Sequence, residues 1–249
     1  MKATPIREKQ INIGSFFVDS RQRLTPNSLL ELMQDVAWEH STSYNVGWEF
    51  LQTINLFWAL SKMHIKINRL PRWTEEITLR TWGKTPENVI FHRDFEMLDA
   101  EGNLLLNATS SWATLAIDTG RVQKLPEEVG YRLPVPPNKY AILEPAPKIQ
   151  KMEVITPPVF QSVRYSDIDM NQHVNNTKYI LWVLNSFDFQ FLMENDLSEI
   201  IINYISQAKM GDFYAIETVV VAPDHFISLI YSKENREICK VETFWKKGN

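Results

Sequence analysis

Proline is concentrated in one stretch of this chain, and that stretch limits how the rest can fold. Eight of the thirteen prolines lie between Pro126 and Pro158. Proline fixes φ and has no N–H to donate, so a segment this rich in proline is neither a central strand nor a helix interior. Residues 126–160 are therefore predicted to be an extended connector between two units, residues 1–125 and 161–249.

The segment before the connector is predicted to form one helix followed by strands. A helix start at Thr25-Pro26 precedes a stripe of residues at positions 29, 33, 36 and 40, the spacing of a helix with one buried face. Apolar residues then alternate with polar ones, which is typical of strands in an antiparallel meander. The strand candidates are residues 63–67, 77–81, 89–97 and 104–117, with a turn at 99–103.

The segment after the connector repeats this order. Residues 175–177 can cap a helix in which aromatic and aliphatic residues recur every four positions, at 179, 183, 187 and 191. The strand candidates that follow are residues 200–205, 213–221, 226–231 and 237–245.

The repeated order of elements indicates two related units, although identity between them is slight. Alignment by pattern sets residues 28–29 against 178–179, an offset of 150, and residues 76–78 against 215–217, an offset of 139. One long helix followed by four or five antiparallel strands is the element order of a sheet wrapped round a helix, the hot-dog arrangement. The predicted fold class is α+β, a tandem or double hot-dog; two unrelated α+β halves are the alternative.

Composition and absent motifs exclude several classes of function. Lysine and arginine number 26, aspartate and glutamate 30, so a net charge of −4 offers no general attraction to nucleic acid. No apolar run is long enough for membrane insertion or a secretory signal. The single cysteine, Cys239, rules out an intrachain disulfide and a cysteine-based zinc site, and favours the cytoplasm. The sequence also lacks the G-x-S-x-G, H-E-x-x-H, P-loop and G-x-G-x-x-G motifs.

The densest group of polar residues is R-Y-S-D-I-D-M-N-Q-H-V-N-N, residues 164–176, directly before the second predicted helix. Residues 167, 169, 171 and 173 are spaced by two, which in an extended segment directs all four side chains to one side. A carboxylate, an amide and an imidazole then meet free N–H groups at a helix start, where a developing oxyanion is stabilised. This set suits acyl transfer to water. In the structural alternative, Asn175 caps the helix and Asp169 only pins His173.

The motif D-x-D-x-N-Q-H-V-N-N, followed by T-K-Y-I-L-W, resembles the fatty acyl-ACP thioesterases of plastids and bacteria, a double hot-dog family. The resemblance is specific over residues 164–182 and extends more weakly over nearly the whole chain. It implies that Asp169, Asn171 and His173 are the catalytic residues. It also implies that the first unit holds the acyl chain, so Trp38 and Trp58 are candidates to bind substrate there.

The chain departs from the family at two positions. Gln207 and Ala208 stand where the family usually has a Glu-Cys pair. Ala208 cannot be a nucleophile, and Cys239 is predicted to be a small core residue. Gln207 can orient a water but cannot take its proton, so the base must be Asp169 or His173.

We therefore expect hydrolysis of a fatty acyl thioester by water, with no metal and no organic cofactor. Asn171 and N–H groups at the helix start polarise the carbonyl, and Asp169 orients His173, which deprotonates a water held partly by Gln207. Asn175 and Asn176 are further candidates for substrate binding. Arg23 takes roughly the place of His173 in the first unit, so one site is expected.

Acyl carrier protein (ACP) is the partner that the resemblance implies, with the chain as a monomer or homodimer. Because ACP is acidic, basic residues are candidates for its docking surface. The alternatives are an acyl-CoA thioesterase, a hot-dog dehydratase, or an acyl-binding module weakened by the loss of the carboxylate at Gln207. The basic candidates are Arg69, Arg72, Lys209, Lys246 and Lys247.

Overall fold

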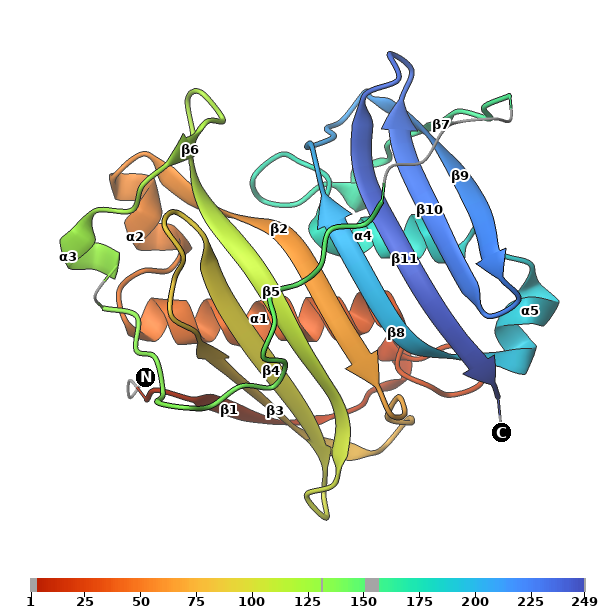
Figure 1. Ribbon diagram of the computed structural model, residues 1–249, viewed down its shortest axis with the longest axis horizontal. Coiled ribbons are helices and arrows are strands. Elements are labelled where there is room, and N and C mark those ends of the chain that lie inside the picture. The colour runs from red at the N-terminus through yellow and green to blue at the C-terminus, as the bar shows by residue number, and fades with distance from the viewer. Residues whose placement is uncertain (1–3, 131, 151–156, 249) are drawn as a thin grey trace. The chain divides into compact units, whose positions relative to one another are not determined.

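The computed structural model describes residues 4–130, 132–150 and 157–248. The chain divides into two compact units, one ending at Ala146 and one beginning at Pro147 (Figure 1). This division falls inside the predicted connector, residues 126–160, of which residue 131 and residues 151–156 lie outside the described residues. The limits of the connector itself stay a prediction.

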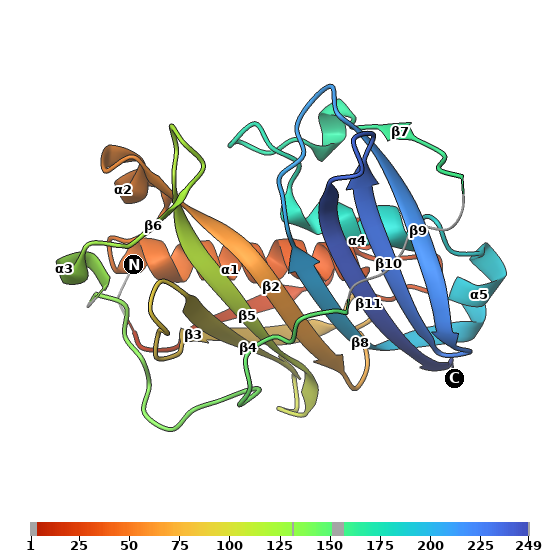
Figure 2. The same ribbon diagram turned by 45° about the horizontal axis from the view of Figure 1, so that its top comes forward.

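The first unit is an antiparallel sheet with a long helix, α1, along one face (Figure 2). Its strands are ordered β1-β3-β4-β5-β2, and a short β6 pairs with β5. The helices are α1 (Pro26–Ser43), α2 (Trp48–Thr53) and α3 (Glu127–Gly130). The strands are β1 (Arg7–Asn12), β2 (Leu56–Ile67), β3 (Glu76–Gly83), β4 (Phe91–Asp99), β5 (Leu104–Ala116) and β6 (Val122–Gln123).

The predicted first helix is confirmed as α1. The side chain of Thr25 caps it by accepting the N–H of Ser28 at 3.3 Å, and Pro26 occupies the first turn, where no N–H is required. The predicted stripe is buried, with Leu29 and Val36 fully inaccessible to solvent. The helix packs on β3 and β1, and burial of this stripe stabilises it.

The second unit has the same strand order, β7-β9-β10-β11-β8. Both units are therefore hot-dog units, and the predicted fold class is confirmed. The helices are α4 (Asn176–Leu184) and α5 (Phe189–Glu194). The strands are β7 (Gln161–Ser162), β8 (Asn195–Tyr204), β9 (Phe213–Ala222), β10 (His225–Ser232) and β11 (Glu237–Lys247).

The predicted meander holds for three strands in each unit and is wrong for the fourth. The first strand after the long helix pairs with the last of the predicted strands of its unit: β2 with β5, and β8 with β11. Strand periodicity predicts which face a residue occupies, but it does not predict which strand is the neighbour.

The second helix is shorter than predicted, because α4 ends at Leu184 and a separate helix begins after Asp188. The hydroxyl of Ser186 donates to the carbonyl of Val183 at 2.7 Å, and Asp188 caps α5 by accepting the N–H of Phe191 at 3.1 Å. Such short polar side chains compete with the helical backbone. The four-residue spacing to Phe191 therefore does not reflect one continuous helix.

One of the two predicted offsets is confirmed and the other needs correction. Asn12 pairs with Glu76 in the first unit, and Ser162 pairs with Phe213 in the second. Asn12 and Ser162 are 150 positions apart, as predicted. Glu76 and Phe213 are 137 apart, and not 139. A slip of two residues keeps every side chain on its face, so an alternating pattern cannot reveal it.

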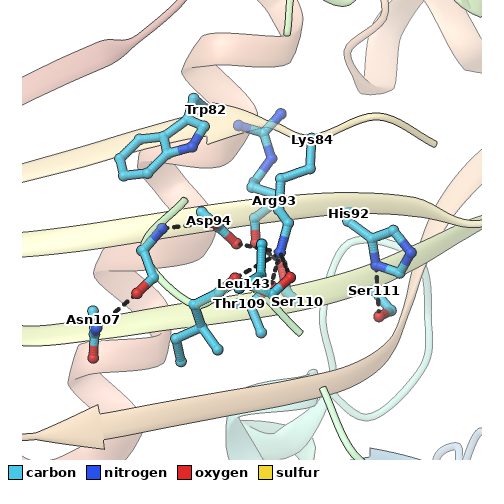
Figure 3. Close-up of polar contacts among 12 residues, drawn as sticks. Trp82, Lys84, His92, Arg93, Asp94, Asn107, Thr109, Ser110, Ser111 and Leu143 are labelled. Atoms are coloured by element: carbon cyan, nitrogen blue, oxygen red, sulfur yellow. Dashed lines mark hydrogen bonds and ion pairs between the residues drawn. The ribbon is translucent and has the colours of Figure 1, made fainter. Parts of the chain in front are cut away.

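Residues 139–143 lie on the face of the first sheet opposite α1, held by a buried polar network (Figure 3). Lys84 donates to the carbonyl of Ile142 at 2.7 Å and forms an ion pair with Asp94 at 3.4 Å. Asp94 accepts the N–H of Ala141 at 2.8 Å, and the indole N–H of Trp82 donates to the carbonyl of residue 139 at 3.0 Å. This part of the predicted connector is therefore fixed to the sheet.

Candidate active site

The segment predicted to be extended is a closed loop that leads into α4. Asp169 donates its N–H to the carbonyl of His173 at 2.9 Å, and Gln172 donates to the carbonyl of Asp169 at 3.0 Å. Gln172 has φ of 62°, so the chain turns back on itself there. The expectation that residues 167, 169, 171 and 173 share one side of an extended segment is wrong.

The two carboxylates of the motif both hold backbone of their own loop. Asp167 lies in a short 3-10 helix, is buried, and accepts the N–H of Arg164 at 2.8 Å. Asp169 is half-buried and accepts the N–H of Asn171 at 2.8 Å through Oδ1. Hydrogen bonds to an ionised carboxylate are stronger than neutral ones, so Asp169 fixes the turn that carries Asn171.

His173 is half-buried where the loop meets the segment after β8. It pairs with Lys209 in an antiparallel bridge, and the next residue, Val174, donates its N–H to the carbonyl of Ala208 at 2.8 Å. Its Nδ1 is buried and has no hydrogen-bond partner among the described residues. The carboxylate of Asp169 is thus not bonded to that nitrogen, which differs from the predicted orienting role.

Gln207 follows the end of β8 by three residues, in the segment that pairs with the loop. Its side chain is exposed, whereas the neighbouring Ala208 is fully buried. Cys239 lies on β11, fully buried, and burial raises the pKa of its thiol well above the usual value. It is the small core residue that the sequence predicted.

Asn175, a predicted substrate-binding residue, is the helix cap of α4. Its Oδ1 accepts the N–H of Thr177 at 3.0 Å and the hydroxyl of Thr177 at 2.8 Å. One donor at the helix start is therefore already satisfied by the protein. Asn176 is the first residue of α4 and is half-buried.

The two tryptophans proposed to bind substrate lie in the first unit in different settings. Trp38 is on α1 and is 41% exposed. Trp58 is on β2, donates its indole N–H to the carbonyl of Val46 at 2.9 Å, and packs edge-on against Phe91. It belongs to a compact apolar cluster that includes Leu51, so its indole is held by core packing.

The first unit contains a copy of the candidate loop, 150 positions earlier. Asp19 donates its N–H to the carbonyl of Arg23 at 2.8 Å, and its Oδ1 accepts the N–H of Arg21 at 2.9 Å, as Asp169 does with His173 and Asn171. Gln22 has φ of 60° and matches Gln172. In place of an imidazole, Arg23 forms an ion pair with Asp19 at 2.7 Å. The Asp and Gln shared at this offset are a sequence signal for the repeat.

Two of the basic residues proposed for docking are engaged within their own unit. Arg69 binds Glu75 at 2.7 Å and Asp99 at 3.3 Å, and Lys247 approaches Glu194 at 3.5 Å. The side chains of Arg72 and Lys209 are exposed, and each residue pairs through its backbone with the loop of its unit. Lys246 is also exposed.

Across residues 4–130, 132–150 and 157–248, no three His, Cys, Asp or Glu side chains gather closely enough to hold a metal ion. Within the same ranges, no helix combines the length and the apolar character needed to cross a membrane.

Comparison with known proteins gives matches for both units. Residues 7–132 match the acyl-ACP thioesterase N-terminal domain and residues 159–247 match the acyl-ACP thioesterase C-terminal domain. The chain is 29% identical over 240 residues to the oleoyl-acyl carrier protein thioesterase 2, chloroplastic, of Arabidopsis thaliana, covering 89% of this chain and 65% of that protein. It is 31% identical over 208 residues to the palmitoyl-acyl carrier protein thioesterase, chloroplastic, of Gossypium hirsutum, covering 79% and 50%. The chain thus spans less than two thirds of the length of these relatives.

Solved structures share the fold. The 12:0-ACP thioesterase from Umbellularia californica aligns with a TM-score of 0.88 at 22% identity, covering 98% of each chain. An acyl-ACP thioesterase from Bacteroides thetaiotaomicron aligns with a TM-score of 0.84 at 23% identity, covering 97% of this chain and 98% of that one.

Proposed function

The chain belongs to the acyl-ACP thioesterase family, and from this premise we propose that it hydrolyses the thioester of fatty acyl-ACP, releasing a free fatty acid and ACP. The family match spans both units. The observation that carries the proposal is the closed loop before α4, which brings Asp169, Asn171 and His173 together around one turn.

The reaction needs a nucleophilic water, a base and a stabilised oxyanion. The water oxygen bonds to the carbonyl carbon, His173 takes the water proton, and the C–S bond breaks as the carbonyl re-forms. The same proton then passes from the imidazolium to the leaving sulfur. In this proposal the amide of Asn171 and a backbone N–H at the start of α4 donate to the oxyanion.

The contacts of Asp169 support a role different from the one read from sequence. Because its Oδ1 holds the N–H of Asn171, the carboxylate fixes the turn that presents that amide. Asp169 thus acts through loop geometry.

Gln207 supports a water-binding role. Its side chain is exposed on the segment that pairs with His173, and its amide can donate to or accept from a water but cannot remove the proton. With Ala208 beside it and Cys239 buried, a cysteine nucleophile is left out of this mechanism.

The substrate-binding assignments are also part of the proposal. The acyl chain is taken up by the first unit, with Trp38 and Trp58 as candidate contacts, and Asn176 is the candidate at the start of α4. ACP docks through exposed basic residues, for which Arg72 and Lys209 are the first candidates. We place the protein in the cytoplasm on the basis of its single cysteine.

The decisive experiment measures release of free fatty acid from matched acyl-ACP and acyl-CoA thioesters. We expect turnover of acyl-ACP, and we expect His173→Ala and Asp169→Asn each to lower it by at least about a hundredfold, the usual scale of lost acid–base catalysis. Normal turnover in His173→Ala contradicts the assignment. Faster turnover of the CoA thioester makes the protein an acyl-CoA thioesterase.

A catalytically weakened acyl-binding module is the second candidate, because Gln207 replaces a carboxylate. Restoring the carboxylate with Gln207→Glu distinguishes the binding module from the enzyme. If the wild type binds acyl-ACP without hydrolysing it and Gln207→Glu gains activity, the binding function is correct. Wild-type hydrolysis that is lost in His173→Ala supports the enzyme.

A further inference from the structure

Tyr179 lies on the first turn of α4, three residues after its first residue, Asn176. It is 4% exposed, and its ring packs edge-on against Trp182 and Tyr204, with centroids 5.2 and 5.9 Å away. Its hydroxyl oxygen accepts the backbone N–H of Ala208 at 3.3 Å. A helix side chain is thereby bonded to the segment that carries Gln207.

The backbone of Ala208 has partners on two sides. Its N–H bonds to Tyr179, and its carbonyl accepts the N–H of Val174 at 2.8 Å. The next residue, Lys209, pairs with His173. One short segment is thus held against α4 by a phenol and against the loop by backbone hydrogen bonds.

The Tyr179 hydroxyl is suited to hold this segment as a neutral group. Burial raises the pKa of Tyr179, and the nearby Cys239 and Asp169 raise it further, although the hydrogen bond from Ala208 opposes the shift. The phenol therefore stays protonated near neutral pH, when its oxygen can accept from Ala208 without introducing a buried charge.

We propose that Tyr179 is a positioning residue for the hydrolysis proposed above: its hydroxyl holds the Gln207–Lys209 segment against the His173 loop and so sets the distance between Gln207, its water and the imidazole. The inference rests on the proposed function. It assigns the hydroxyl a role through its contact with Ala208 and not through contact with the substrate.

The neighbouring Tyr204 shows that packing alone does not explain the Tyr179 hydroxyl. Tyr204 lies in the same aromatic cluster, and its hydroxyl is buried with no hydrogen-bond partner among the described residues. Removing either hydroxyl leaves the ring in place. Only removal at Tyr179 leaves the fully buried Ala208 without its acceptor.

The test compares Tyr179→Phe with Tyr204→Phe in full-length protein acting on acyl-ACP. We expect Tyr179→Phe to lower kcat by roughly tenfold or more while KM changes less than about twofold, because a small misplacement of reacting groups costs rate and not ground-state binding. Tyr204→Phe should leave both constants near wild type. Hydrogen exchange at the Ala208 amide should accelerate in Tyr179→Phe only, which reports the broken contact directly.

A double-mutant cycle with Gln207→Ala separates positioning from a general structural effect. If Tyr179 acts by placing Gln207, then Tyr179→Phe should lower kcat by less than about twofold further once Gln207 is truncated. If the reductions in kcat from Tyr179→Phe and Gln207→Ala multiply in the double variant, the proposal is wrong. An unchanged kcat in Tyr179→Phe when His173→Ala is inactive also overturns it, whereas full activity in His173→Ala overturns the proposed function itself.

Discussion

Arg23 in the first unit occupies the backbone position that His173 occupies in the second. Each residue accepts the N–H of an aspartate four positions earlier, and each pairs with a basic residue across the loop, Arg72 or Lys209. The loop is therefore a property of the fold in both units. The imidazole is present only in the second unit, so variants at Arg23 and His173 can be compared in the same loop.

Truncating the two equivalent residues should affect activity in the second unit only. His173→Ala should reduce hydrolysis by at least about a hundredfold, whereas Arg23→Ala should leave the rate within about twofold and lower stability by roughly 0–1 kcal/mol, the usual worth of a partly exposed ion pair. Steady-state rates on acyl-ACP and urea unfolding measure the two quantities. A large loss of activity in Arg23→Ala contradicts the assignment of a single site.

Lys84 and Asp94 should be strongly coupled in stability, because both are buried on the outer face of the first sheet. Lys84→Met leaves the Asp94 carboxylate without its cation, which should cost about 3–5 kcal/mol. The double variant Lys84→Met/Asp94→Leu should recover part of that loss. Urea unfolding of the two single variants and the double variant tests this, and additive losses would show that the pair is not coupled.

His40 should make the stability of the first unit depend on pH. Its Nε2 donates to the carbonyl of Thr4 at 2.9 Å, so its Nδ1 accepts from Arg93 at 2.9 Å, and the ring is neutral. Burial, and then the charge of Arg93, lower the pKa of His40 from 6.5 to about 4.

Because the pKa of His40 is lowered by folding, the free energy of unfolding should decrease as the pH falls. The unfolded state binds the proton first, so the contribution of His40 is fully present above about pH 6.5 and is lost as the pH falls to about 4, a change on the order of 3 kcal/mol. Unfolding free energies measured at pH 7, 5.5 and 4.5 should fall more steeply for wild type than for His40→Gln. Parallel slopes would show that His40 does not titrate in this range.

Asn175 offers a way to separate capping from substrate binding. Asn175→Asp keeps the oxygen that accepts from Thr177 and should leave stability and hydrolysis near wild type, while Asn175→Ala should cost about 1 kcal/mol. Thermal unfolding and acyl-ACP turnover provide the two readouts. A stable Asn175→Asp variant with a raised KM would instead support the substrate-binding role.

Periodicity was sufficient to predict the elements with a buried stripe but not their partners. The residues of α1 follow the 3.6-residue repeat, and most strands follow the two-residue repeat, so their positions were predictable. Strand β1, with the sequence R-E-K-Q-I-N, carries one apolar residue, and it is a strand because it pairs with the edge of β3. Its strand character depends on that partner and is invisible in its own residues.

At the candidate site, too, the sequence predicted the residues but not their contacts. The residue types at Asp169, Asn171 and His173 pointed to the loop, but the reversal at Gln172 requires a positive φ that glutamine seldom adopts. Tyr179 could not be selected from sequence at all. Its hydroxyl matters through a hydrogen bond to Ala208, 29 positions away, and tertiary packing alone creates that contact.

The copied loop in the first unit is a prepared scaffold for protein engineering. Its backbone already turns at Gln22 and already presents Asp19 to the N–H of residue 21, as in the second unit. Grafting an amide and an imidazole there requires side-chain replacement at Arg21 and Arg23 without rebuilding the loop. The first unit, which lacks the imidazole, therefore already contains a folded loop into which new catalytic side chains can be introduced.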